Sequence, residues 1–272
     1  MKYPYGKTIL ITGASSGIGL SCAKMFAENG FTVFACSRRA EQNIENTANG
    51  KIYGVKMDVT NEQSVLDAYN YILSKTDNIG IILHSAGIGI AGSGEDTFCE
   101  EIENLFKTNY FGVLRVNRIF MPIMRKQKNG LILAVSSVAG IISIPYQGHY
   151  SSSKFALEAY IETLRLESKQ FGIKASLIEP GDTKTGFTDS RRYAMPENSP
   201  YMSTCKKSIA KMANDERFGK PPESCAEVAL KLAEKKNPPV RVTVGFTYKL
   251  IVFLKRLLPA KVLEFAVSKL YT

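Results

Sequence analysis

Short apolar segments alternate with longer helical patterns along almost the whole chain. The helical patterns cover residues 17–29, 62–75, 98–127, 149–171 and 223–236, with a weaker helix candidate at 40–49. The apolar segments have the length of buried strands and lie at residues 8–11, 32–36, 52–57, 79–84, 131–135, 174–178 and 240–244. Repeated switching between strand and helix periodicity predicts an α/β protein built from βαβ units.

Strands that are apolar on both faces and separated by helices are typical of a parallel sheet covered on both sides. With right-handed crossovers, the pattern predicts a three-layer, doubly wound Rossmann fold with a seven-stranded parallel sheet. Because no proline- or glycine-rich linker interrupts the chain, we expect residues 1–272 to form a single domain. Ligands of such folds bind beyond the carboxyl ends of the strands.

The net charge of +10 is concentrated near the end of the chain. Residues 203–272 contain 14 Lys and Arg against 6 Asp and Glu, a difference of +8. A basic surface of this kind is most often simply solvated, but it can also meet an anionic cofactor or a membrane. Because no nucleic-acid-reading module is recognisable, we expect no nucleic-acid partner.

The cysteines are odd in number and widely spaced, at Cys22, Cys36, Cys99, Cys205 and Cys225. They form no CxxC pair or Cys/His cluster, so we expect no metal site and no disulfide framework, but buried free thiols. The first residues lack the layout of a signal peptide, and no apolar stretch reaches the roughly 18 residues of a membrane span. We therefore expect a cytoplasmic protein.

The first predicted strand runs directly into a glycine-rich turn, TGASSGIG at residues 12–19, and then into a helix. Gly13, Gly17 and Gly19 let the backbone turn sharply and approach a pyrophosphate, whose charge is favoured by the helix N-terminus. A tight turn that needs glycine for structural reasons alone is the alternative. The position of this turn within a βαβ pattern favours dinucleotide binding.

The spacing TGxxxGxG resembles that of the short-chain dehydrogenase/reductase family. Asp58 and Val59 resemble the family's adenine-contacting pair, and residues 84–87, His-Ser-Ala-Gly, resemble its NNAG motif with both asparagines replaced. Pro180 and Gly181 resemble its PG motif. The resemblance implies a cofactor site that comprises Gly13, Ser15, Ser16, Gly17, Ile18, Gly19, Asp58, Val59, Ser85, Ala86, Gly87, Tyr150, Lys154, Pro180, Gly181, Thr183 and Thr185.

The end of the second predicted strand indicates which nicotinamide cofactor is bound. NAD enzymes usually carry an Asp or Glu there, which holds the ribose 2′-hydroxyl. This chain has Ser37, followed by Arg38 and Arg39. Guanidinium groups bind a 2′-phosphate through charge-assisted hydrogen bonds, whereas a carboxylate would repel it. We therefore expect NADP(H), with Arg38 as the main contact.

Tyr150 and Lys154 lie four residues apart in a predicted helix, which places the phenol and the ammonium on one face. A nearby ammonium is expected to lower the pKa of the phenol from its ordinary value of about 10. Ser137 ends the fifth strand, and Asn109 lies inside the helical pattern at 98–127. These four residues match the family's Asn–Ser–Tyr–Lys tetrad in order and spacing.

The resemblance assigns a role to each member of this tetrad. Tyr150 is the general acid/base that exchanges a proton with the substrate oxygen, and Ser137 hydrogen-bonds the same oxygen. Lys154 tunes Tyr150 and holds the ribose hydroxyls of the cofactor. Asn109 anchors a water that links Lys154 to solvent.

Residues 186–222 correspond to the segment that covers the substrate in this family. Its aromatic and apolar side chains, together with one earlier tyrosine, either line an apolar pocket or only pack within the surface loop: Tyr146, Phe187, Tyr193, Met195 and Tyr201. The basic, amphipathic tail at 246–272 packs on the core or on a sister subunit, or lies at a membrane interface. Similar tails occur in the branch that includes hydroxysteroid and retinol dehydrogenases.

The sequence thus predicts an oxidoreductase that transfers a hydride between NADP(H) and a carbonyl or secondary alcohol. A small hydrophobic substrate, such as a steroid, a retinoid or an acyl ketone, is expected, as is a homodimer or homotetramer. One alternative is a protein that senses NADP(H) without turnover, but such proteins typically lack the Tyr or the Lys. Another is an epimerase or dehydratase, whose substrate segment after the PG motif is usually longer.

Overall fold

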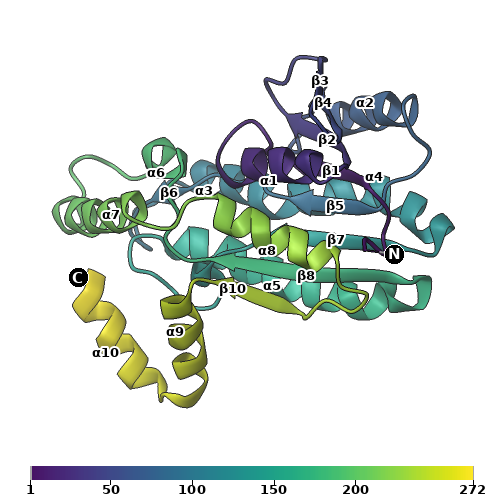
Figure 1. Ribbon diagram of the computed structural model, residues 1–272. Coiled ribbons are helices and arrows are strands. Elements are labelled where there is room, and N and C mark those ends of the chain that lie inside the picture. The colour runs from purple at the N-terminus through teal and green to yellow at the C-terminus, as the bar shows by residue number, and fades with distance from the viewer. Residues whose placement is uncertain (1, 272) are drawn as a thin grey trace.

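A twisted sheet forms the centre of the computed structural model, which describes residues 2–271 (Figure 1). Seven of its strands are parallel, in the order β10-β8-β7-β5-β1-β2-β4, as the sequence predicts. These strands span β1 Thr8–Thr12, β2 Thr32–Ser37, β4 Lys51–Lys56, β5 Ile81–His84, β7 Gly130–Val135, β8 Ile173–Pro180 and β10 Arg241–Val244. All four residues of β5 and the first five of β7 are buried, as expected for central strands covered on both faces.

Helices cover both faces of this sheet and make it the middle layer of three. One core lies beneath α1 and α8, and the other beneath α2, α4 and α5. The main helices are α1 Gly17–Glu28, α2 Glu62–Leu73, α3 Cys99–Phe106, α4 Gly112–Gln127, α5 Gly148–Glu167, α7 Met202–Arg217 and α8 Glu223–Ala233. The strand order reverses direction between β1 and β5, so the doubly wound fold opens a crevice at their carboxyl ends.

An eighth strand, β3 (Ile44–Asn46), pairs antiparallel with β4 at the edge of the sheet. The weak helix predicted at 40–49 is therefore wrong. All three residues of β3 are exposed, so the segment has no apolar stripe with which a helix could pack. A turn closed by the amide of Thr47, which donates to the carbonyl of Gly50 at 3.0 Å, returns the chain to β4.

The helix predicted over 98–127 is interrupted by a π-helical turn at Lys107–Phe111, between α3 and α4. Such turns are rare and often occur at functional sites, because they displace a side chain from the regular helical register. Here the turn contains Asn109, which is 1% exposed.

The tail forms a hairpin of two helices, α9 (Phe246–Leu257) and α10 (Ala260–Tyr271), which projects from the β10 edge of the sheet (Figure 1). Its inner side packs on the core, because Val252 is buried against Val138, Ile141 and Ile142. Large apolar side chains on the outer side stay exposed. Among the described residues, no helix has both the length and the apolar character needed to cross a bilayer.

Four of the five cysteines are buried free thiols, as predicted. Cys99 is the exception, because it is the first residue of α3 and is exposed.

Candidate active site

A cavity of about 890 Å³ lies at the carboxyl ends of the parallel strands. Its walls come from the segments that follow β1, β2, β4, β5, β7 and β8, and from the tail. The predicted cofactor residues are brought together along it, with the exception of Gly19: Gly13, Ser15, Ser16, Gly17, Ile18, Ser37, Arg38, Arg39, Asp58, Val59, Ser85, Ala86, Gly87, Tyr150, Lys154, Pro180, Gly181, Thr183 and Thr185.

The glycine loop has the geometry of a phosphate cradle. Gly13 and Gly17 have positive φ angles of 68° and 53°, which favour glycine. A Cβ on Gly13 would lie 2.7 Å from the backbone of Ala86, so only glycine lets the two loops approach this closely. Ser16 caps α1 without a side-chain hydrogen bond to the helix, which leaves the first amides of α1 free to bind an anion.

Gly19 contributes to packing and does not line the cavity. A Cβ at this position would lie 2.3 Å from the carbonyl oxygen of Gly13. This glycine therefore allows the start of α1 to fold back onto the loop, and its effect on the cofactor site is indirect.

The end of β2 presents a cationic edge to the cavity. Ser37 is buried, and the exposed side chains of Arg38 and Arg39 follow it. Asp58 lies on the neighbouring segment, where its Oδ1 accepts hydrogen bonds from the amide and the hydroxyl of Thr60 at 2.9 and 2.8 Å. Because position 37 carries no carboxylate, this edge suits an anionic group such as a phosphate.

The segment after β5 is held to the glycine loop through Thr12, whose Oγ1 accepts from the amides of Ser85 and Ala86 at 3.2 and 3.3 Å. His84, which replaces the first asparagine of the family motif, points into the protein, where its Nε2 lies 2.8 Å from Asn117 Oδ1. Burial lowers the pKa of His84 to about 4, so the imidazole is neutral. The replacement changes packing behind the loop, while Gly87 still lines the cavity.

Asn109 lies behind the cavity wall and acts on the backbone. Its Oδ1 accepts from the amide of Ile88 at 2.9 Å, and its Nδ2 donates to the carbonyl of Ile88 and to Ser153 Oγ, both at 3.1 Å. Asn109 therefore ties the loop after β5 to α5. Its side-chain hydrogen bonds thus fix the loop that carries Gly87 relative to the helix that carries Lys154, and both residues line the cavity.

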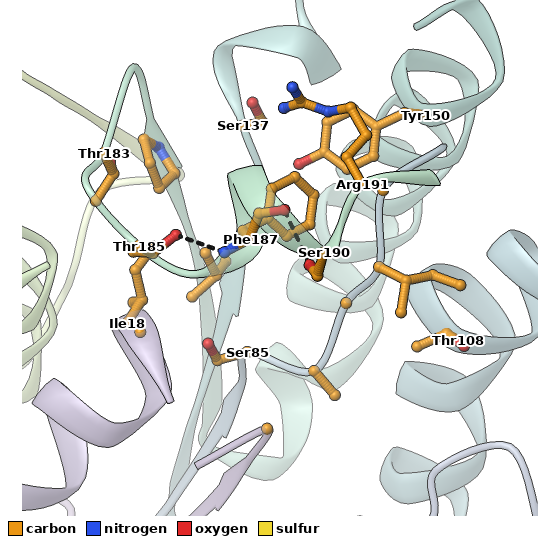
Figure 2. Close-up of a pocket in the computed structure, with 18 of the residues that line it drawn as sticks. Ile18, Ser85, Thr108, Ser137, Tyr150, Thr183, Thr185, Phe187, Ser190 and Arg191 are labelled. Atoms are coloured by element: carbon orange, nitrogen blue, oxygen red, sulfur yellow. Dashed lines mark hydrogen bonds between the residues drawn. The ribbon is translucent and has the colours of Figure 1, made fainter. Parts of the chain in front are cut away.

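Tyr150, Ser137 and Lys154 all line the cavity, and Figure 2 shows Tyr150 and Ser137 on the same side of it. Tyr150 and Lys154 share a face of α5, and Lys154 Nζ is 5.8 Å from the centroid of the Tyr150 ring. Ser137 lies close enough to Tyr150 to oppose the rise in the pKa of the phenol. Lys154 Nζ also donates to the carbonyl oxygen of Val135 at 2.9 Å, which fixes the ammonium at the end of β7.

Burial dominates the titration of these groups. It raises the pKa of Tyr150 to about 12, against the opposing effects of Ser137 and Arg191. It lowers the pKa of Lys154 to about 8. The expected lowering of the Tyr150 pKa by Lys154 is therefore not found in the protein alone, because desolvation of the phenolate outweighs its charged neighbours. At neutral pH the phenol is protonated and able to donate.

A second buried charged group lies next to Lys154 on α5. Glu158 is 5% exposed, and burial raises its pKa to about 7. Arg241 on β10 lies 3.5 Å from both Glu158 and Glu179. None of these three groups lines the cavity, but the charge of Glu158 favours the ammonium form of Lys154.

The segment predicted to cover the substrate contributes differently from expectation. Of the five candidate pocket residues, only Phe187 lines the cavity, and its ring centroid is 5.6 Å from that of Tyr150. Tyr146 and Met195 pack in a separate apolar cluster with α7, whereas Tyr193 and Tyr201 are exposed. These four side chains therefore follow the second alternative from the sequence, in which they pack within the loop or lie on its surface.

Several lining residues were missed by sequence reasoning, including Arg191, Glu216, Tyr248 and Tyr271. The tail reaches the cavity because the ring of Tyr248 rests on Gly181, where a Cβ would lie 2.1 Å from the ring. Gly181 was visible in the sequence as part of the PG motif, but nothing in the sequence pairs it with Tyr248.

The family model described as short chain dehydrogenase matches residues 7–196 of the chain. The chain belongs to the short-chain dehydrogenase family. This short-chain dehydrogenase is 39% identical over 266 residues to a 3-ketodihydrosphingosine reductase of Bacteroides thetaiotaomicron, with 97% of each chain covered. It is 30% identical over 271 residues to retinol dehydrogenase 8 of Bos taurus, covering 93% of this chain and 86% of that protein.

Solved structures of short-chain dehydrogenases share the fold of this one. The enzyme from Burkholderia phymatum, solved in complex with NAD, has a TM-score of 0.80 at 24% identity, covering 94% of this chain and 95% of that chain. Family membership makes the protein a short-chain oxidoreductase and supports a nicotinamide cofactor as the occupant of the cavity.

Proposed function

We propose that the protein is an NADP(H)-dependent oxidoreductase that transfers a hydride between the nicotinamide and a carbonyl or secondary alcohol of a hydrophobic substrate. The observation that carries this proposal is the convergence of Tyr150, Ser137 and Lys154 on the cavity that the glycine loop also lines. When bound, the cofactor supplies the hydride chemistry. The residues of the chain bind it, orient the substrate and handle the proton.

Tyr150 is proposed to donate the proton to the substrate oxygen during carbonyl reduction. Its pKa of about 12 keeps the phenol protonated at neutral pH, the state that a general acid needs. Ser137 lines the same cavity as Tyr150, opposes the rise in the pKa of its phenol, and would hold the same substrate oxygen. Lys154, fixed by the carbonyl of Val135, is placed to hold the ribose hydroxyls and to restore the proton to Tyr150.

The preference for NADP(H) is supported by the edge after β2. Arg38 and Arg39 are exposed on the cavity wall. Position 37 carries the buried Ser37, so no carboxylate is present there to bind the ribose 2′-hydroxyl. A guanidinium there would bind the 2′-phosphate through charge-assisted hydrogen bonds.

A long-chain ketone is the substrate class best supported. The bacterial relative is a 3-ketodihydrosphingosine reductase with 39% identity over nearly the whole chain, and the bovine relative is a retinol dehydrogenase. Both names indicate elongated, mainly apolar substrates. The cavity wall beyond Tyr150 contains apolar and aromatic side chains suited to such a molecule: Ile144, Phe187, Met212, Tyr248 and Tyr271.

An NADPH-consumption screen tests this function. The purified protein is given 3-ketodihydrosphingosine, ketosteroids, retinal, acyl ketones and small aldehydes, each with NADPH and with NADH. We expect fast NADPH oxidation with a long-chain ketone, at least tenfold slower oxidation with NADH, and little activity on small aldehydes. No oxidation of either cofactor with any carbonyl would refute the proposal.

We further propose that the outer side of the α9–α10 hairpin contacts an anionic membrane surface, from which such a substrate would enter. Large side chains are exposed there, among them Phe246 (82%), Phe253 (57%), Leu257 (65%) and Phe265 (65%). The hairpin carries five Lys and Arg and a single Glu, so it complements anionic headgroups. A symmetric contact with a second copy would instead bring the same cations together.

Vesicle sedimentation tests this contact. We expect binding to vesicles that contain phosphatidylserine, weaker binding to purely zwitterionic vesicles, and loss of binding when Phe253 and Phe265 are both changed to Ser. Leu166→Ser is the matched control, because Leu166 is 74% exposed on α5 and lies outside the hairpin. Equal sedimentation of all three proteins would contradict the proposal.

A further inference from the structure

Arg191 is a buried cation in the wall of the cavity that none of the roles above uses. Its side chain is 2% exposed, and it lies between α6 (Phe187–Ser190) and the short strand β9 (Arg192–Tyr193). β9 pairs with β6 (Ile90–Ala91), which fixes the backbone beside Arg191. Figure 2 shows the guanidinium on the same side of the cavity as Tyr150 and Ser137.

The guanidinium has one charged partner and unused donors. Its Nη2 pairs with Glu216 of α7, and the other carboxylate oxygen of Glu216 accepts from Thr188 Oγ1 at 2.6 Å. The Nε and Nη1 atoms of Arg191 are buried without a hydrogen-bond partner. Leaving N–H groups buried and unpaired is unfavourable, so an acceptor that reaches them from the cavity would be bound well.

The position of the free donors connects them with the reaction. The positive charge of Arg191 is close enough to Tyr150 to lower the pKa of the phenol. The guanidinium carbon also lies 5.8 Å from the centroid of the Phe187 ring, which in turn packs on Tyr150. An acceptor bound by Arg191 would therefore lie on the same side of the cavity as the carbonyl that Tyr150 protonates.

The surrounding charge selects the kind of acceptor. Glu216 already neutralises Arg191, and Asp182, which also lines the cavity, is close enough to Glu216 to feel its negative charge. An anionic group would leave an excess of negative charge in a buried site, which is costly. A neutral oxygen satisfies the free donors without that cost.

We propose that Arg191 binds a neutral oxygen of the substrate, a hydroxyl or a second carbonyl, close to the reacting ketone, and that Glu216 positions the guanidinium. This inference rests on the proposed carbonyl reduction and deepens it. The preferred substrate is then a long-chain ketone with an oxygen function near the carbonyl, and a plain hydrocarbon ketone is a poorer one.

The test uses two long-chain 3-ketones of equal length, one with and one without a hydroxyl on carbon 1, and the full-length protein with NADPH. One hydrogen bond to a charged donor corresponds to roughly a tenfold change in affinity. We therefore expect kcat/KM to favour the hydroxylated ketone by about tenfold. Arg191→Met should remove this preference, mainly through a rise in KM for the hydroxylated ketone that the plain ketone does not share.

Two further variants separate a binding role from a structural one. Arg191→Met with Glu216→Gln leaves no unpaired buried carboxylate, so it carries the test if the single variant unfolds, and it should lose the same preference. Arg217→Met is the matched control, because Arg217 is 64% exposed and pairs with Asp189 at 3.1 Å on the surface of the same segment. This control should keep the preference for the hydroxylated ketone.

Equal losses on both ketones in the Arg191 variants would overturn the proposal, as would weakened NADPH binding, which would place the guanidinium on the cofactor. If the unchanged protein turns over neither ketone, the proposed function fails.

The role of Arg191 is then tested by ligand affinity instead of turnover. Calorimetry compares the affinities of a long-chain 1,3-diol and the matching 3-alcohol for the NADPH-loaded protein. Equal affinities in the unchanged protein would overturn the proposal.

Discussion

Lys154 Nζ lies 5.8 Å from the ring centroid of Tyr150 while donating a hydrogen bond of 2.9 Å to the carbonyl of Val135. The ammonium is thus anchored to the end of β7 and faces the phenol from one helical turn away. Because Lys154 is only 5% exposed, its charge is held there at the expense of stability, as reflected in its lowered pKa of about 8.

Lys154→Met should stabilise the protein at neutral pH while reducing activity. The fall in pKa from 10.5 to about 8 corresponds to about 3 kcal/mol, and loss of the hydrogen bond to Val135 offsets about 1 kcal/mol of this. Below pH 8 both folded and unfolded states hold the proton, so the penalty is fully present. Between pH 8 and 10.5 the unfolded state binds more protons, so the unchanged protein gains stability as pH rises.

Urea denaturation at pH 7 and at pH 10 measures this difference. We expect the variant to be more stable by about 2 kcal/mol at pH 7 and the gap to have closed by pH 10. Glu158, whose pKa is about 7, titrates in both proteins and so affects both curves. A variant that is less stable at pH 7, with a gap independent of pH, would show that burial of the ammonium carries no penalty.

Arg38→Ala should change the choice of cofactor. Loss of a charge-assisted hydrogen bond to the 2′-phosphate is expected to weaken NADPH binding by about 10- to 100-fold, whereas NADH binding should change less than about twofold. Fluorescence titration of each reduced cofactor gives both affinities. Arg118→Ala, on the exposed face of α4 and paired with Glu62, is the control. An unchanged NADPH/NADH ratio in Arg38→Ala would remove Arg38 from the phosphate site.

Gly13→Ala should damage both the fold and cofactor binding. The residue has a φ of 68°, and an added Cβ would lie 2.7 Å from the backbone of Ala86. Backbone strain alone costs about 1–2 kcal/mol, and the loop after β5 must also shift. Thermal unfolding and NADPH titration test this against Gly94→Ala, where a Cβ would meet nothing within 4 Å. Equal behaviour of the two variants would contradict the described loop geometry.

The parallel sheet could be predicted because its central strands, such as β5 and β7, are apolar on both faces, a pattern that the local sequence displays directly. β3 could not, because its exposed residues carry no periodicity and form a strand only by pairing with the edge of β4. The same holds for Arg191, whose burial depends on a contact with Glu216, 25 residues further along the chain. Long-range contacts of this kind leave no local pattern.

Residues of the site that belong to a recurrent spacing, such as Tyr150 and Lys154, were therefore found in the sequence, and residues brought in from distant segments were missed. Tyr248 and Tyr271 reach the cavity only because the inner side of the tail packs against Val138, Ile141 and Ile142.

Assembly into a homodimer or homotetramer stays a prediction, which analytical ultracentrifugation can test.

Turnover and cofactor binding by Tyr150→Phe test the central claim most directly. The phenyl ring fills the same space and keeps the contact with Phe187, so only the hydroxyl is lost. With a long-chain ketone that the unchanged protein reduces, we predict that NADPH affinity stays within about twofold and that kcat falls by at least about a hundredfold, as expected for loss of a general acid. Unchanged turnover in a variant that binds NADPH normally would contradict the assignment of Tyr150 as the proton donor.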